Sequence, residues 1–274
     1  MLLSNYISNK IIYFQKCVEA PQVVEEVDNS GLRGVSSYLR GTPEWNQLKK
    51  LLEDESNRYF VLWIGQLASA LKNDLSSFLT DNFGLESIAE WEVSEISEEA
   101  EDGTQVRSVI RVPQYISIGL HSALAAFVRS AHAAGPHALP QSSQLLLTQE
   151  CASSIIDAYF AYSEQRKLMQ NVALQLYFDV QFVTQCMVSR DNRSLSTISL
   201  STLTSLEKHI DPFDLSVFTP YVSEHVKKNC ARSQTLFGVL IPSDRFSLLA
   251  SLKASLGSNA SGGVSGDQQH NVIR

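Results

Sequence analysis

The order of apolar and polar residues follows the period of an α-helix over most of the chain. Apolar side chains recur three and four positions apart, which is the spacing of one helix face. Prolines mark the expected helix ends, because proline fits the first helical turn and breaks a helix interior. The chain contains eight prolines, and the spans 44–112 and 141–211 contain none. The pattern predicts an all-α fold, a mostly antiparallel bundle or rod of about six to eight helices.

The predicted helices carry apolar stripes that should form the core. Helix starts are expected at Thr42-Pro43, after Pro113, after Pro140, near Ser163, before Ile198 and at Thr219-Pro220. The first stripe comprises Leu48, Leu51, Leu52, Tyr59, Leu62, Leu67, Leu71, Leu75 and Phe78, and the last comprises Val222, Val226, Cys230, Ser233 and Phe237. Gly65 can bend or divide the first helix. The segment 163–188 is apolar on more than one side, so we expect it at the centre of the bundle.

One stretch departs from the helical pattern. Eight acidic residues and no basic residue lie between Glu86 and Asp102. Around the turn signal Asp102-Gly103, apolar residues alternate with polar or charged ones, which is typical of strands. Two interpretations are open: a marginal β-hairpin near 90–112, with Glu90 and Glu92 close to Arg107 and Arg111, or a mobile acidic loop.

These patterns divide the chain into four predicted parts. They are an N-terminal helical segment at 1–80, an acidic linker or hairpin at 81–112, a C-terminal helical bundle at 113–241 and a flexible Ser/Gly-rich tail at 242–274. The Gly/Ser composition of the tail is typical of flexible linkers.

Composition narrows the classes of function. The formal net charge is −7, with 29 acidic and 22 basic residues, so the basic footprint of nucleic-acid binding is missing. No apolar run approaches the roughly 20 residues of a spanning helix, and we expect no signal peptide. The four cysteines, Cys17, Cys151, Cys186 and Cys230, form no C-x-x-C pair. They are expected to be reduced and buried, as on the cytosolic side of membranes.

The sequence offers no recognisable catalytic constellation. It has no G-x-S-x-G, G-x-x-x-x-G-K, G-x-G-x-x-G or H-E-x-x-H motif. We therefore predict no catalytic residue, no cofactor and no metal site. The alternative is a helical hydrolase or transferase, in which a cleft brings His121 or His209 to a serine and a carboxylate.

The densest local signal is the segment Ile210 to Pro220. Asp211 before Pro212 should end one helix, and Asp214 suits a first turn. If the segment is a structural corner, Phe213 and Phe218 are buried, and both aspartates lie at the surface near helix termini. If it is a partner-binding epitope, at least one phenylalanine is exposed beside other apolar residues.

A small basic face is expected on the last helix, opposite its apolar line. It consists of Lys227, Lys228 and Arg232. Such a face is usually solvated, but it can also contact acidic partners or, weakly, anionic lipid. The candidate partner-binding residues are therefore Asp211, Phe213, Asp214, Phe218, Lys227, Lys228 and Arg232.

Five segments carry a resemblance to a known family. They are Ser108-Val-Ile-Arg-Val-Pro113, His137-Ala-Leu-Pro140, Leu174-Gln-Leu-Tyr-Phe-Asp179, Ile210–Pro220 and Ser233-Gln-Thr-Leu-Phe-Gly238. Together they resemble, in order, the C-terminal portion of the subunit 1 family of the conserved oligomeric Golgi tethering complex. Residues 1–107 resemble that family only in their general character, and none of the five segments lies in them.

The resemblance implies a non-catalytic helical scaffold, peripheral on the cytosolic face of Golgi membranes. Such complexes tether vesicles in retrograde intra-Golgi transport. The implied partners are the other subunits, with subunit 8 the expected contact. Subunits 2, 3 and 4 are expected to bundle with a long N-terminal helical region of the family that this sequence does not contain.

Overall fold

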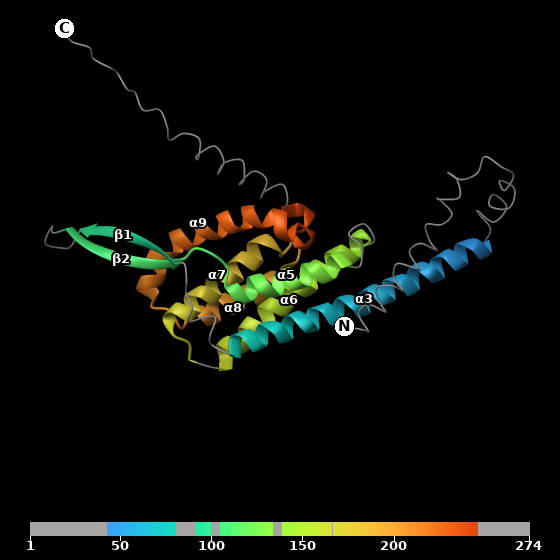
Figure 1. Ribbon diagram of the computed structural model, residues 1–274, viewed down its shortest axis with the longest axis horizontal. Coiled ribbons are helices and arrows are strands. Elements are labelled where there is room, and N and C mark those ends of the chain that lie inside the picture. Colours follow the sequence, from blue (N-terminus) through green and yellow to red (C-terminus); the bar gives the residue numbers. More distant parts are fainter. Residues whose placement is uncertain (1–42, 81–90, 100–104, 134–138, 166, 246–274) are drawn as a thin grey trace, which may run out of the picture.

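The computed structural model describes residues 43–80, 91–99, 105–133, 139–165 and 167–245. Its elements, in order, are α3 (Pro43–Thr80), β1 (Trp91–Glu99), β2 (Gln105–Pro113), α5 (Ile118–Ala133), α6 (Gln141–Gln165), α7 (Gln170–Cys186), α8 (Arg193–Glu207), α9 (Pro212–Phe237) and the 3₁₀ turn η1 (Gly238–Leu240). Helices take up most of the described residues, and the strands form one small antiparallel sheet (Figure 1). The predicted all-α bundle with a marginal hairpin is confirmed. Thr42, Glu90, Cys17, Gly135-Pro136 and the tail beyond Arg245 lie outside the described residues.

Helix α7 lies at the centre of the bundle, as its two-sided apolar pattern predicts. It packs against α6, α8, α9 and strand β2. Every residue from Val172 to Val180 is buried, including the polar Gln175 and Asp179. The free cysteines Cys151 and Cys186 are buried on α6 and α7, and Cys230 is buried on α9, so burial is confirmed for these three.

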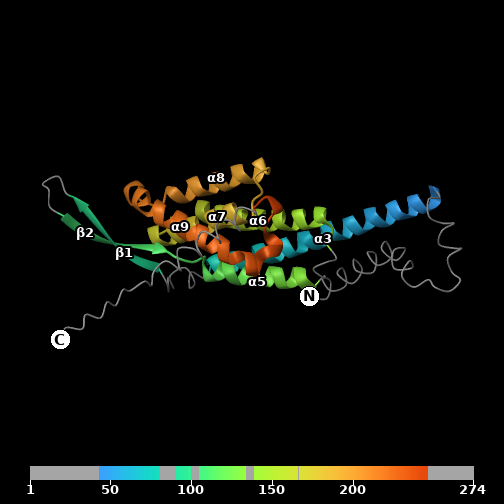
Figure 2. The same ribbon diagram turned by 90° about the horizontal axis from the view of Figure 1, so that it is seen from above.

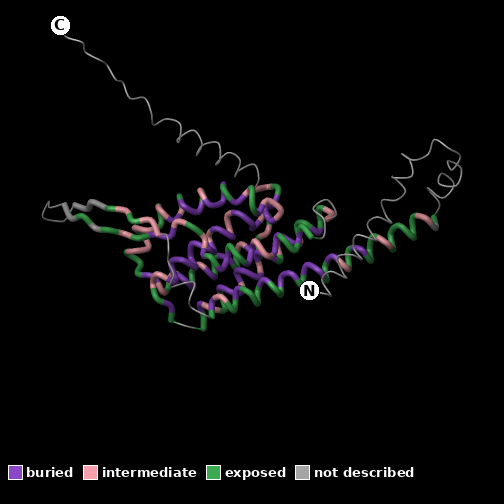
Figure 3. Tube along the Cα trace, viewed as in Figure 1, coloured by how far each residue is buried: buried purple, intermediate pink, exposed green. Residues whose placement is uncertain are grey.

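Helix α3 is a single continuous helix, and Gly65 does not divide it. Its second half packs on α5 and α6 through Phe60, Trp63 and Ile64 together with the predicted Leu67, Leu71 and Leu75. The predicted stripe is wrong at Leu48, Leu51 and Leu62, which are exposed. The first turns of α3 extend past the bundle, and their exposed positions are visible in Figure 3. Residues of α3 and of the segment 113–241 share one core, and the four-part domain division stays a prediction.

Two predicted helix starts are wrong. The third helix, α6, continues to Gln165 beyond the expected start at Ser163, and α7 begins only at Gln170. The last helix begins at Pro212, and Pro220 lies inside it. Because proline has no amide hydrogen, the Ser216 carbonyl has no helical donor at position 220. Ser216 and Pro220 are both exposed, so this carbonyl can bind water instead.

The hairpin projects from one end of the bundle, the end opposite to the start of α3 (Figures 1 and 2). Its register places Glu92 opposite Val112 and Val93 opposite Arg111. Glu92 and Arg111 therefore lie on opposite faces of the sheet, because side chains alternate along a strand. The expected proximity of Glu92 to Arg107 and Arg111 is wrong, and the hairpin interpretation is confirmed over the loop interpretation.

Candidate functional site

The first turns of α9, residues 211–218, form the end of the bundle where the sequence places its strongest signal; we call them the α9 corner. The Asp211 side chain caps the helix by accepting a hydrogen bond from the Phe213 amide at 2.8 Å. Asp214 accepts one from Gln170 Nε2 at 2.5 Å, which ties the start of α9 to the start of α7. The aspartates are thus where the sequence predicts them, Asp211 exposed and Asp214 half-buried near helix termini.

The two phenylalanines of the α9 corner do not behave alike. Phe218 is half-buried and packs against the core. Phe213 is 69% exposed, so its predicted burial is wrong. Because α9 runs unbroken from Pro212, Phe213 falls outside the buried stripe and on an exposed line at helical spacing. That line is Phe213, Ser216, Pro220, Glu224 and Lys227.

The basic face on α9 is partly neutralised by the chain itself. Lys228 forms an ion pair with Glu224 at 2.6 Å, and this pairing, chiefly by hydrogen bonding, lowers the pKa of Glu224. The Arg232 guanidinium lies 5.8 Å from the centre of the Tyr115 ring, within reach of a cation–π contact. Lys227 is exposed at the end of the line that begins with Phe213. Of the three residues of the basic face, Lys227 therefore lies on the same side of α9 as Phe213.

A shallow depression of about 400 Å³ lies where α6 and α8 end, next to the α9 corner; we call it the basic basin. Its lining residues are Ser163, Glu164, Gln165, Lys167, Ser205, Lys208 and His209. Inside it, the Ser205 hydroxyl donates to Glu164 Oε1 at 2.6 Å, and the Ser163 hydroxyl lies 3.2 Å from that of Ser205. Of these lining residues, His209 was a candidate from the sequence, whereas Lys167 and Lys208 were not.

The basin brings His209 close to two serines and a carboxylate, which is the arrangement that the hydrolase alternative requires. Its geometry does not suit nucleophilic catalysis. Both serine side chains are buried, with Ser163 3% and Ser205 4% exposed, so a substrate cannot reach them. Among the described residues, no hydrogen bond joins the His209 ring to either hydroxyl, and Ser205 donates to Glu164 instead.

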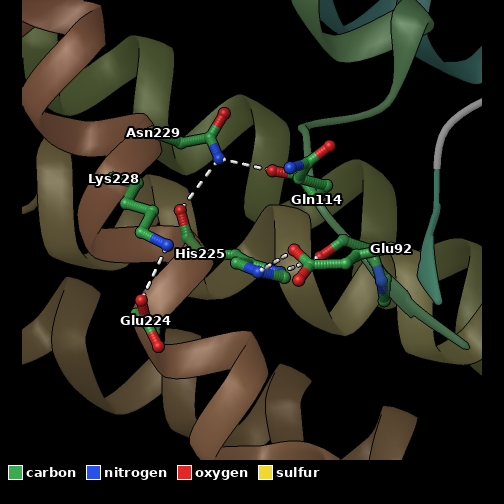
Figure 4. A network of polar contacts seen from close by, with 7 residues as sticks. Glu92, Gln114, Glu224, His225, Lys228 and Asn229 are labelled. Carbon is green, nitrogen blue, oxygen red and sulfur yellow. Dashed lines mark hydrogen bonds and ion pairs between the residues drawn. The ribbon is translucent and has the colours of Figure 1, made fainter. Parts of the chain in front are cut away.

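The hairpin is anchored to α9 by a polar cluster that the sequence analysis did not foresee (Figure 4). The buried His225 ring places Nδ1 2.9 Å from the Pro113 carbonyl oxygen and Nε2 2.9 Å from a Glu92 carboxylate oxygen. One turn further, Asn229 Nδ2 donates to the Gln114 carbonyl at 2.7 Å. Both ring nitrogens face acceptors, so only a ring that carries two protons donates to both. The signal that could have revealed this cluster is the polar pair His225 and Asn229 on the buried side of α9.

A second polar cluster links the hairpin to the centre of the bundle. The Trp91 indole N–H donates to Gln175 at 3.1 Å, and Gln175 donates to Asp179 at 3.2 Å. Asp179 also accepts from the Ser117 amide at 2.9 Å and the Tyr159 hydroxyl at 3.0 Å. Burial, and then the charge of Asp179, raises the pKa of Tyr159 well above its usual value, so the hydroxyl stays protonated as a donor.

Replacing His225 by alanine should loosen the hairpin. The substitution leaves Pro113 and Glu92 without their buried partner, and hydrogen bonds of charged groups contribute about 1.5–3 kcal/mol. Hydrogen exchange followed by mass spectrometry should show faster exchange at 105–113, with exchange in α7 changed less. Glu95→Gln, a change at an exposed residue of strand β1, is the control. Unaltered exchange in the hairpin of His225→Ala would contradict this anchoring role.

Among the described helices, none has the length and apolar character to cross a membrane. Within the same residues, no group of three or more His, Cys, Asp or Glu side chains is arranged to hold a metal ion.

The fold and the two polar clusters place the chain in the class of all-helical bundle proteins with an anchored, projecting hairpin. Three curated proteins are similar to it in sequence, and each is subunit 1 of the conserved oligomeric Golgi complex. The human protein is 29% identical over 72% of this chain, the mouse protein 30% over 74%, and the Drosophila melanogaster protein 27% over 74%. The resemblance expected from the sequence motifs is confirmed.

The chain spans 22% of the length of the human and mouse relatives and 24% of the Drosophila relative. No family model matches the chain. No solved structure matches it either.

Proposed function

We propose that this chain is a non-catalytic scaffold piece of a Golgi vesicle-tethering complex, acting in retrograde intra-Golgi transport by assembling with other subunits. Similarity to three subunit 1 proteins supports the assignment to such a complex. The chain would act on the cytosolic face of Golgi membranes, held there peripherally through the complex. Subunit 8 is the proposed first contact, and subunits 2–4 are further partners of the family.

The observation that carries the proposed contact is the exposure of Phe213 at the α9 corner. An aromatic side chain costs little conformational entropy when it binds, and aromatic residues dominate the energetics of many interfaces. The Asp211 cap and the Asp214–Gln170 hydrogen bond hold the backbone around Phe213 in place. The α9 corner therefore presents a pre-positioned apolar anchor, which is the epitope alternative of the sequence analysis.

Replacing Phe213 by alanine should weaken subunit binding while leaving the melting temperature nearly unchanged. Loss of a central aromatic anchor typically costs about 2 kcal/mol or more, roughly a thirtyfold loss of affinity. The measurement is calorimetric titration of this chain with the complex assembled from the other subunits, followed by titration with subunit 8 alone.

Leu236→Ala is the matched control, because Leu236 is also an exposed apolar residue of α9 but lies at its other end. It should bind as the unaltered chain does. Equal affinities for Phe213→Ala and Leu236→Ala would show that the α9 corner is not the contact. Failure of the unaltered chain to bind any assembly of the other subunits would refute the proposed function as a whole.

A further inference from the structure

We infer that the basic basin receives an acidic side chain of a partner protein segment whose apolar residues pack on Phe213. This inference rests on the proposed function, and it adds the chemistry of the partner. The segment that fits is an acidic peptide stretch with apolar residues next to its carboxylates.

Carboxylates and lysines differ in their partners at this end of the bundle. Four carboxylates of the described residues lie at this end, and each accepts a hydrogen bond within the chain, Glu207 from Tyr177. Glu164 accepts from Ser205, Asp211 from the Phe213 amide and Asp214 from Gln170. The basin lining contains two lysines, Lys167 and Lys208, and one carboxylate, Glu164. Among the described residues, Lys167, Lys208 and His209 take part in no ion pair.

Charge complementarity follows from this imbalance. Lys167 and Lys208 are exposed and His209 is half-buried, so a ligand can reach all three. The chain as a whole carries a net charge of −7, which makes an unmatched group of cations a local exception. A carboxylate entering the basin would gain two cationic neighbours, Lys167 and Lys208, without displacing an internal ion pair.

The basin is continuous with the α9 corner. Two residues after Lys167 comes Met169, the N-cap of α7, which is 56% exposed. The Gln170–Asp214 hydrogen bond holds that start against the first turn of α9. His209 lies two residues before the Asp211 cap, and Phe213 lies two residues after it. Cations and two exposed apolar side chains thus adjoin one another, so a single short segment can contact both.

The exposed apolar side chains favour a protein segment over a lipid surface. An aromatic and a thioether side chain beside a small basin match alternating apolar and acidic side chains of a peptide. A membrane surface would engage a broader polybasic area, and on the basic face of α9 Lys228 is already paired with Glu224 and Arg232 lies over the Tyr115 ring.

The test is a charge reversal, Lys167→Glu with Lys208→Glu, in the full chain. Both side chains are exposed, so the melting temperature should change little. Binding to the complex assembled from the other subunits should weaken about tenfold or more, and the affinity of the unaltered chain should fall as salt is raised. Lys49→Glu with Lys50→Glu is the matched control, with the same change of charge on the remote start of α3.

A second measurement does not need the complex. A fluorescein-labelled peptide of alternating glutamate and leucine should bind the unaltered chain more tightly than its glutamine counterpart, and the basin variant should lose that preference. If the unaltered chain binds the subunits and the basin variant binds them equally well, the inference fails while the proposed function stands. If the chain prefers the acidic peptide but binds no subunit, the proposed function fails and the basin chemistry stands. Binding to phosphatidylserine vesicles that the basin variant loses, without any peptide preference, would overturn the inference in favour of a lipid surface.

Discussion

A Phe178→Ala substitution should lower the free energy of unfolding by about 3–5 kcal/mol, the usual range for removing a buried aromatic ring. Phe178 is 0% exposed on α7, the helix that α6, α8 and α9 all contact. Its removal leaves a cavity where several helices meet, and the surrounding side chains cannot collapse into it without moving a helix. Because a domain of ordinary stability has about 5–15 kcal/mol in total, the loss should be visible as a large shift of the urea midpoint.

Phe213→Ala provides the control for this experiment, because it removes the same ring from an exposed position. Its unfolding free energy should stay within about 0.5 kcal/mol of that of the unaltered chain. Similar losses in both variants would contradict the placement of Phe178 at the centre and of Phe213 at the surface. Taken with the binding measurement above, the pair separates the residue that holds the bundle together from the residue proposed to contact a partner.

The central helix was predictable because its signal is redundant. Between Val172 and Val183 nine of the twelve positions are apolar, so small errors in register do not change the prediction of burial. The single apolar stripe of α3 is a weaker signal, because a small error in register changes which residues are predicted to be buried. Leu48, Leu51 and Leu62 were assigned to it on spacing alone, whereas the face that contacts α5 and α6 contains Phe60 and Trp63.

The prediction that Phe213 is buried is wrong because it places a helix start at Thr219-Pro220. Thr219-Pro220 has the form of a helix start, and a helix starting there makes Phe213 part of a corner. In the structure α9 already begins at Pro212, and it tolerates Pro220 on its exposed side. Once α9 is continuous, helical spacing alone assigns Phe213 to the line of Ser216, Pro220, Glu224 and Lys227. The chemistry of proline therefore allows a helix either to start at Pro220 or to continue through it, and tertiary packing decides between the two.

The polar clusters at the hairpin base could not be derived from the sequence. His225 and Pro113 are 112 positions apart, and Trp91 and Gln175 are 84 apart. Neither pairing has a local signature, because each depends on how the helices pack. Two segments that carried the family resemblance meet here, since Pro113 ends one and Asp179 ends the other. Their role in the structure is to join the hairpin to the bundle.

Asp179 should make the stability of the protein depend on pH in the mildly acidic range. Burial raises the pKa of this carboxyl to about 6 from a usual value of 3.8, although hydrogen bonds from Ser117, Tyr159 and Gln175 oppose this rise. Between those two values the folded state binds more protons than the unfolded state. The free energy of unfolding therefore falls as pH rises through this window. The stabilising contribution is complete below about pH 4 and is lost as pH rises through about 6.

The size of this effect should be about 3 kcal/mol, because a tenfold change in the proton affinity of a group corresponds to about 1.4 kcal/mol. Asp179→Asn removes the titrating group from the same buried position. Urea unfolding from about pH 4 to about pH 7 should therefore show the stability of the unaltered chain falling relative to that of Asp179→Asn by roughly this amount. Asp191→Asn, at an exposed aspartate, controls for the change in net charge. Parallel pH profiles for the unaltered chain and Asp179→Asn would show that the Asp179 carboxyl does not titrate differently in the folded and unfolded chain.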